Sequence, residues 1–505
     1  MKIFLKFKIQ LKLNSLAFIL ILFFTNFVTL VYSQEIKLLT LYEVINFAKE
    51  QSPDAILSKH VFRNSYWEFR TYKASQKPSL DLNATLPELN RSISKITQND
   101  GSDAFRSRQF ASYSLGLALT QNISLTGGRF FVNSDINRLD DFSDSTVTSS
   151  YLSTPISVGF TQPVFGFNSY RWEKKIEPLK YEEAKKEYVS TIEEISLKAV
   201  NYFFDLALAQ INLNIAEINY SNNDTLFKIA QGRYNIGTIA QNELLQMELN
   251  FLQSGASLNE SKLDLEVKKF KLRSFLGFNE NIDLQLIVPS EVNKLQIDVT
   301  KAKEVAIENN PQMLLYKRQM IEAQRDVAKA KSENRFNANL YASFGLTQSA
   351  YSLQKAYENG QDQQKVTVGV QVPVIDWGLG KGKYKMAMSS QEVIKTRVEQ
   401  ALIDFEQDIF LKVMQFNMQN ENLKIAAKSD TVAQMRYDIS KQRFYIGKIN
   451  VTDLTIALTE KDGAKRTYIS ELRNYWNYYY TIRKQTLFDF EKNQQIEVDT
   501  EGILK

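Results

Sequence analysis

The sequence contains two related units in tandem, and this duplication limits the possible folds more than any other feature. Glu50–Asp54 resembles Glu308–Gln312, and the prolines inside these segments are 258 residues apart (311 minus 53). Gln162–Val164 resembles Val372–Val374, and there the prolines are 210 residues apart (373 minus 163). Two constant offsets separated by one jump indicate homologous units. The first unit carries 48 additional residues (258 minus 210) between its matched blocks.

The N-terminal segment indicates export. Basic residues precede a largely apolar stretch from Leu13 to Val31, which predicts a secretory signal peptide over residues 1–33, cut after Ser33. The chain has no cysteine, so no lipid is expected on its mature N-terminus. No later stretch reaches the roughly 18 uninterrupted apolar residues that a membrane helix requires.

The duplication also predicts domain boundaries. We expect a first repeat over residues 34–280, a linker over 281–298, a second repeat over 299–490 and a tail over 491–505. Both repeats predict a first helix, alternating strands, one very long helix and a second helix that returns after a short break.

Local patterns place these elements along the chain. Thr40 and Glu43 have the spacing of a capping box, and Asn310-Pro311 has the form of an N-cap followed by proline. Alternation of apolar and polar residues predicts strands over residues 80–86, 156–160, 340–346 and 366–374. Long helices are expected over residues 178–231 and 381–442, with returning helices over residues 241–275 and 451–488. Residues 282–286 could add a short strand.

Composition argues against several functional classes. The chain has no cysteine and one histidine, His60, which leaves little basis for a catalytic or metal site. A formal net charge of +5, spread over 505 residues, does not suggest a nucleic-acid partner. We therefore expect no enzyme activity, no cofactor and no metal.

The predicted strands raise a question of oligomeric state. Two hairpins give four strands with open edges, and an open edge is not stable in lipid because its backbone groups lack partners. Three copies would pool twelve strands, enough for a closed barrel. A further hairpin, predicted near residues 107–140 within the extra 48 residues, could join that barrel or fold outside it.

These features together resemble the TolC-like family of outer-membrane efflux proteins. The marks are the signal peptide, the tandem units, the strand-exit segments Phe160–Phe165 and Val370–Gly378, and the helix ends Arg233–Thr238 and Arg443–Lys448. The resemblance implies an α+β membrane protein. Its tandem-repeat helical hairpins would form a periplasmic α-barrel, and its β-hairpins would be pooled in a trimeric outer-membrane β-barrel.

The resemblance also implies partners and a location. We expect a homotrimer in outer-membrane lipid that extends into the periplasm. Its helix tips would dock a periplasmic adaptor, or membrane fusion protein, which joins it to an inner-membrane RND or ABC transporter, the proton-driven and ATP-driven kinds of pump. The pump supplies the energy, so the channel needs no catalytic residues.

Particular residues are carried over from the family pattern. Asp453 matches an acidic residue that rings the periplasmic mouth, Glu243 is its equivalent in the first repeat, and Phe444 stands where a gating tyrosine occurs. A second acidic position falls on Ile456, so a double acidic ring is not expected. The expected adaptor-docking residues are Arg233, Ile236, Gly237, Thr238, Arg443, Ile446, Gly447 and Lys448.

Three functions agree with the sequence to different degrees. The first is the exit duct of a tripartite efflux pump for small molecules. The second is the same duct in a type I protein secretion system, which differs in the partner pump. The third, a soluble periplasmic coiled-coil scaffold, leaves the alternating strands unexplained.

Overall fold

The computed structural model describes residues 35–142, 146–278, 282–289, 292, 294–499 and 502–503. The predicted signal peptide therefore lies outside the described residues. The chain forms two compact units. The first comprises residues up to Pro53 together with Lys198–Asn293 and Ala426–Arg473, and the second comprises Asp54–Leu197, Lys294–Ile425 and Asn474–Lys505.

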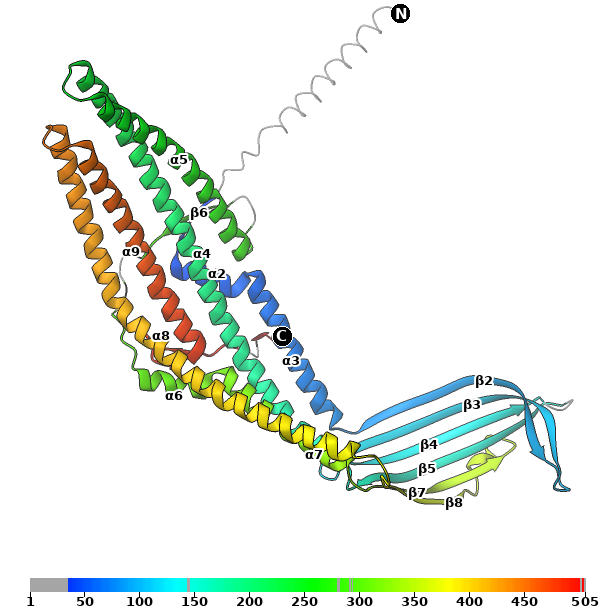
Figure 1. Cartoon of the computed structure of the whole chain (residues 1–505). Helices are drawn as coiled ribbons and strands as arrows, with labels where there is room; N and C mark the ends of the chain where they lie inside the picture. The colour runs from blue at the N-terminus through cyan, green and yellow to red at the C-terminus, as the bar shows by residue number, and fades with distance from the viewer. Residues whose placement is uncertain are drawn as a thin grey trace, which may run out of the picture. The chain divides into compact units, whose positions relative to one another are not determined.

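Duplication is visible in the helices, which occur in pairs of equal length. The pairs are α2 (Leu41–Gln51) with α6 (Val299–Asn309), α3 (Pro53–Ser75) with α7 (Pro311–Glu333), α4 (Ser169–Asn235) with α8 (Leu379–Tyr445), and α5 (Gln241–Leu276) with α9 (Val451–Thr486). Their lengths are 11, 23, 67 and 36 residues. In Figure 1, α5 returns beside the end of α4, and α9 returns beside α8. The tandem helical hairpins of the predicted fold class are confirmed.

Local capping explains where the shorter helices begin. The Thr40 side chain accepts a hydrogen bond from the Glu43 amide, and the Glu43 carboxylate accepts one from the Thr40 amide at 2.8 Å. This is the predicted capping box. The Asn310 side chain likewise accepts from the Gln312 amide at 2.8 Å, with Pro311 in the first turn, so the predicted N-cap is confirmed.

The start of the first long helix differs from the prediction. α4 begins at Ser169 rather than at Pro178, so the proline lies inside the helix. The side chain of Asn168 accepts a hydrogen bond from the Arg171 amide at 3.2 Å and so caps a helix that begins nine residues before Pro178. A proline usually marks the first helical turn, and here the Asn168 cap overrides that tendency.

Six strands form a single antiparallel sheet in the order β2-β3-β4-β5-β7-β8 (Figure 1). Their bounds are β2 Ser79–Thr97, β3 Asp103–Ile123, β4 Gly128–Asp141, β5 Thr148–Val164, β7 Asn337–Ala350 and β8 Gln361–Gln371. The extra hairpin, whose place the sequence left open, is β3-β4, and it lies between β2 and β5. The main sheet of this chain thus has six strands, where the two hairpins predicted from both repeats would give four.

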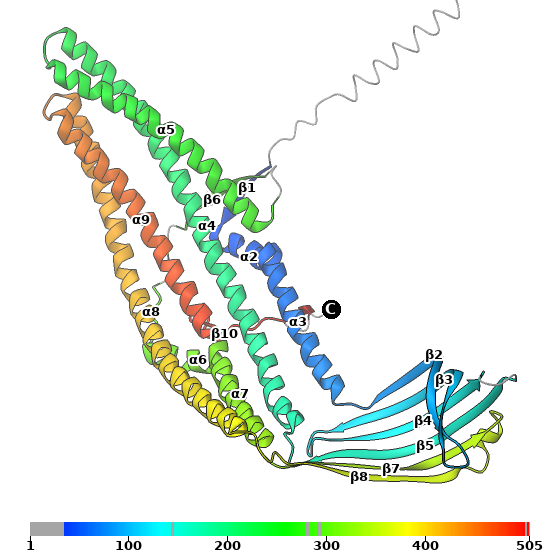
Figure 2. The same cartoon turned by 45° about the vertical axis from the view of Figure 1, so that its right-hand side comes forward.

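The sheet joins the two repeats and ends in two open edges. β5 of the first repeat pairs with β7 of the second, with Val158 opposite Phe344. β2 and β8 form the edges, as Figure 2 shows from a second direction. β8 ends at Gln371, short of the predicted residue 374, because Pro373 has no N–H to donate to a ladder.

A small parallel sheet lies in the first compact unit. β6 (Ile282–Ile287) is the strand that the sequence suggested, and it pairs with β1 (Glu35–Thr40), which the sequence analysis did not anticipate. The Lys37 ammonium lies over the rings of Phe47 and Phe278, at 4.1 and 4.7 Å from their centroids. These contacts tie the strand ends to α2 and to the end of α5.

In the second compact unit, a buried arginine joins α9 to α4 and to the C-terminal segment. Arg483 donates to Glu193 at 2.8 Å and to Asp489 at 2.5 Å, and all three side chains are almost fully buried. Burial alone would raise the pKa of Asp489, but the Lys492 amide and Arg483 hold it below its usual range. Within the described residues, no helix is both long and apolar enough to cross a membrane.

Candidate functional site at the ends of the helical hairpins

The turns that close the two helical hairpins share one backbone geometry. Gly237 and Gly447 have φ values of 74° and 72°, which is the left-handed region that favours glycine. The Gly237 amide donates to Tyr234 and the Thr238 amide donates to Arg233, both at 2.9 Å, and the second turn repeats both bonds at the same distances. This pairing is a Schellman motif, so each glycine is required by the way its helix ends.

Each turn presents a large apolar side chain to solvent. Ile236 is 75% exposed and its repeat equivalent Ile446 is 66% exposed. Thr238 and Lys448, which follow the two glycines, are exposed as well. An exposed isoleucine at the same position of both turns is a surface that a partner protein could cover.

Phe444 has a different environment, because it is buried in a small core beneath the turns. The core is formed by Leu226, Ala230, Met247, Tyr437, Phe444, Val451 and Leu454. Phe444 is 4% exposed. The core is well shielded from water, since burial raises the pKa of its Tyr437 phenol to about 12. In the single chain Phe444 is therefore a packing residue, and a gating role for it stays a prediction.

Arg233 connects the two hairpins. Its guanidinium donates to the carbonyls of Phe444 and Tyr445 at 3.4 and 3.1 Å, and lies 5.3 Å from the centroid of the Phe444 ring. It thereby pairs with carbonyls at the C-terminus of α8, where a positive charge is favoured by the helix dipole. Its repeat equivalent, Arg443, is exposed. Sequence analysis grouped both arginines as docking residues and missed this difference, which depends on a contact 211 residues away.

The two acidic candidates occupy equivalent positions in the first turns of their helices. Asp453 is exposed at the start of α9, where its amide donates to the Asn450 side chain at 2.8 Å. Glu243 is half-buried at the start of α5. A carboxylate in a first helical turn is favoured by the helix dipole, which is a sufficient local reason for both. Their role in a ring of charge depends on neighbouring copies and stays a prediction.

Across the described part of the chain, no group of three or more histidine, cysteine, aspartate or glutamate residues is placed to hold a metal ion. The turns contain one basic link, two exposed isoleucines and two carboxylates.

The chain is similar to known outer-membrane proteins. A family model described as "outer membrane efflux protein" matches residues 130–278. The structure is similar to the CmeC outer membrane channel of Campylobacter jejuni, with a TM-score of 0.65 and 16% identity over 92% of this chain and 88% of that one. It is also similar to the outer membrane protein VceC of Vibrio cholerae, with a TM-score of 0.62 and 13% identity over 90% and 97% of the two chains. No curated protein sequence matches the chain.

The chain resembles the TolC-like outer-membrane efflux proteins. The resemblance inferred from the sequence is thus confirmed, and so is the α+β fold class with long helical hairpins and an antiparallel sheet. The matching family is one of transport proteins rather than enzymes. The matched residues cover β4 from residue 130 onward together with β5, α4 and α5, and so include the turn of the first helical hairpin.

Proposed function

We propose that this protein is an outer-membrane channel. It would act as the exit duct of a tripartite efflux pump, through which small molecules pass from an inner-membrane transporter. The observation that carries the proposal is the six-stranded sheet with two open edges. The family match over residues 130–278 supports it.

The open edges argue for assembly in a membrane. The apolar residues of β2 and β8 remain uncovered in the single chain: Leu82 is 67% exposed and Val368 is 63% exposed. In lipid, each unpaired edge requires a partner strand, because exposed backbone N–H and C=O groups have no water to bind. A second copy of this chain can supply it, with β8 of one copy against β2 of the next.

The strand number affects the width of the pore. In the homotrimer that the family resemblance implies, three copies of six strands would close an eighteen-stranded barrel, rather than the twelve strands that four per chain would give. Since barrel diameter grows roughly in proportion to strand number, the extra hairpin β3-β4 would widen the pore by about half.

The turns of the two helical hairpins would form the periplasmic end of the duct. Ile236 and Ile446 would pack against the periplasmic adaptor, with Thr238 and Lys448 beside them, while Asp453 and Glu243 would face the mouth. Rings of like charge in a trimer can select cations or hold a closed state electrostatically. The adaptor would connect the channel to an RND or ABC transporter. A type I secretion system is the alternative, and it would differ in that pump.

Adaptor docking is tested by photo-crosslinking in the native cell. A photoreactive residue replaces Thr238 or Lys448, and a control probe replaces Lys262, an exposed residue of α5 outside the turns. Mass spectrometry identifies the adducts. We expect a periplasmic adaptor from the two turn positions alone, and its companion pump then separates small-molecule efflux from protein secretion. Capture of the same proteins at Lys262, or no capture at the turns while the control probe reacts, would contradict docking.

Barrel assembly is tested separately. A photoreactive residue at Leu82 in the edge strand β2 should crosslink to β8 of another copy and give dimers and trimers on a denaturing gel. The matched probe at Leu119 in the inner strand β3 should give adducts within one chain only. Equal yields between copies from both positions would argue against edge pairing.

A further inference from the structure

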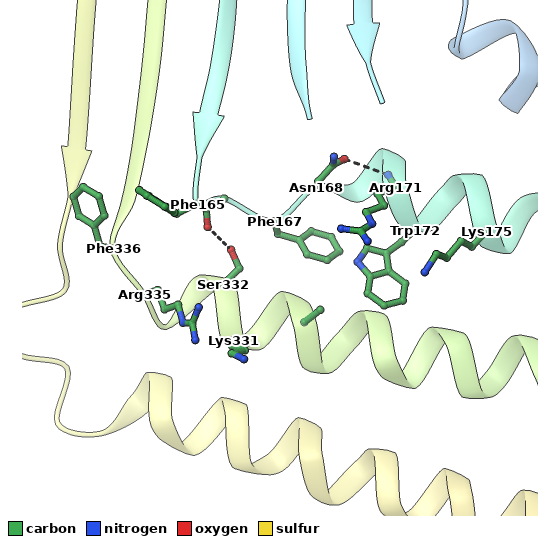
Figure 3. A pocket seen from close by; sticks show the side chains of 12 residues that line it. Phe165, Phe167, Asn168, Arg171, Trp172, Lys175, Lys331, Ser332, Arg335 and Phe336 are labelled. Atoms are coloured by element: carbon green, nitrogen blue, oxygen red, sulfur yellow. Dashed lines mark hydrogen bonds between the residues drawn. The ribbon is translucent and has the colours of Figure 1, made fainter. Parts of the chain in front are cut away.

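A cavity of about 870 Å³ lies where the sheet meets the helices of the second compact unit (Figure 3). It is lined by residues that follow β5 and begin α4, by the end of α7, and by the segment that joins α7 to β7: Phe165, Gly166, Phe167, Asn168, Arg171, Trp172, Lys175, Ala328, Lys331, Ser332, Arg335 and Phe336. Ser332 donates to the Phe165 carbonyl at 3.1 Å, which holds the two sides together.

The lining is strongly basic. Four of the twelve lining residues are cationic, and none is acidic. Arg171 and Lys175 come from α4, Lys331 from α7, and Arg335 from the segment between α7 and β7. The structure records no ion pair for these four side chains within its described residues. Lys175 instead lies 5.1 Å from the centroid of the Trp172 ring. Arg318 and Arg483 of the same unit, by contrast, are each paired with two carboxylates.

Aromatic side chains complete the cavity. Phe165 and Phe336 lie with their ring centroids 5.9 Å apart, and Phe165 is 69% exposed. Phe167 and Trp172 line the cavity on the α4 side, near Arg171 (Figure 3). Aromatic rings next to basic residues are typical of the level at which a membrane protein leaves the hydrocarbon and meets lipid headgroups.

The position of the cavity along the chain agrees with a location at the lipid headgroups. Phe165 directly follows the last residue of β5, and Phe336 directly precedes the first residue of β7. If the sheet crosses the membrane, as the proposed function requires, these residues leave it at the periplasmic side. The cavity then lies beside the headgroups of the inner leaflet.

We propose that this cavity binds the phosphate of an anionic glycerophospholipid. The four cations surround the phosphate, and the exposed rings of Phe165 and Phe336 pack against the glycerol and the first acyl carbons. A phosphate oxygen is a strong acceptor for arginine and lysine, and a cavity without carboxylates favours an anion. The site would anchor each subunit at the boundary between sheet and helices. The inference rests on the proposed function, because only a membrane location brings lipid to this cavity.

The test compares two double variants of the full-length mature protein with the same change in charge. Lys175→Gln/Lys331→Gln removes two lining cations, whereas Lys174→Gln/Lys329→Gln removes two exposed lysines of the same helices that do not line the cavity. Each delipidated protein is titrated with phosphatidylglycerol, phosphatidylethanolamine or inorganic phosphate, and bound molecules are counted by native mass spectrometry. Single-channel conductance is recorded from the same preparations in planar bilayers.

We expect phosphatidylglycerol, which is anionic, to bind the wild type more tightly than zwitterionic phosphatidylethanolamine does. The lining variant should lose about thirtyfold in affinity, because each basic residue near anionic headgroups contributes about fivefold. The control variant should bind like the wild type.

Equal losses in both variants, or equal binding of the two lipids, would overturn the site. Inorganic phosphate binding as tightly as phosphatidylglycerol would overturn the lipid assignment and indicate a soluble phosphate ligand. Loss of the site with conductance intact would leave the channel proposal standing, whereas absence of conductance in the wild type would overturn that proposal itself.

Discussion

Replacing Arg233 by alanine should loosen the end of the second hairpin, although Arg233 belongs to the first. Its guanidinium donates to the carbonyls of Phe444 and Tyr445 and lies over the Phe444 ring. Hydrogen bonds from a charged donor contribute about 1.5–3 kcal/mol when buried, and a cation–π contact about 0.5–1 kcal/mol at exposed sites. Arg233 is half-buried and one of its two bonds is long, at 3.4 Å, so we expect a combined loss of about 1.5 kcal/mol.

Hydrogen–deuterium exchange at the second turn measures this loss. The amides of Ile446 and Gly447 donate to Gln442 and Phe444, and they exchange when the end of α8 opens. A loss of about 1.5 kcal/mol in the free energy of local opening should accelerate their exchange about tenfold. The measurement requires only the purified protein at constant pH, with peptides that cover α8 and α9 resolved by mass spectrometry.

The duplication supplies the control. Arg443→Ala removes the same side chain at the equivalent position of the second repeat, where the arginine is exposed, so exchange at both turns should change less than about twofold. Equal acceleration in the two variants would show that the effect comes from the lost charge. No acceleration in Arg233→Ala would refute the link between the hairpins.

Three further predictions address other parts of the molecule. Deleting residues 103–141, the hairpin β3-β4, should lower single-channel conductance to about half. In the proposed trimer the barrel would go from eighteen to twelve strands, and the pore area would fall to about the square of two-thirds of its value; unchanged conductance would place the hairpin outside the pore wall. Asp489→Asn should lower the melting temperature at pH 7, and the difference from the wild type should shrink as pH falls below the ordinary pKa of aspartate. A carboxyl with a lowered folded pKa stabilises the fold above its ordinary value of about 3.9 and loses that contribution as pH falls, so a pH-independent difference would contradict the assignment. Asn310→Ala should destabilise the second unit by about 1–2 kcal/mol in denaturant unfolding, since it removes the cap of α7 and a 2.7 Å bond to the Gln485 carbonyl. The control Asn334→Ala, at the other end of α7, should cost less because that residue is only half-buried and does not cap the start of the helix.

The sequence by itself determined the repeated helices and the location of the turns. Thr40 and Asn310 mark helix starts through bonds to neighbouring residues, and Gly237 and Gly447 mark the turns because only glycine readily adopts the required φ. These are local interactions, so the pattern of residues within a few positions contains the necessary information. The two constant offsets along the chain then related one hairpin to the other.

Only the tertiary structure decided which segments lie against one another. Alternation along residues 113–119 predicted a strand but could not say that β3 pairs with β2 and β4 inside the main sheet, because period two reports the faces of a strand and not its neighbours. The repeat made Arg233 and Arg443 equivalent, yet one links two hairpins and the other is exposed. The four cations of the basic cavity come from two segments far apart in the sequence, around residues 171–175 and 331–335. Contacts between distant segments depend on which surfaces the fold buries together, and no local pattern records that choice.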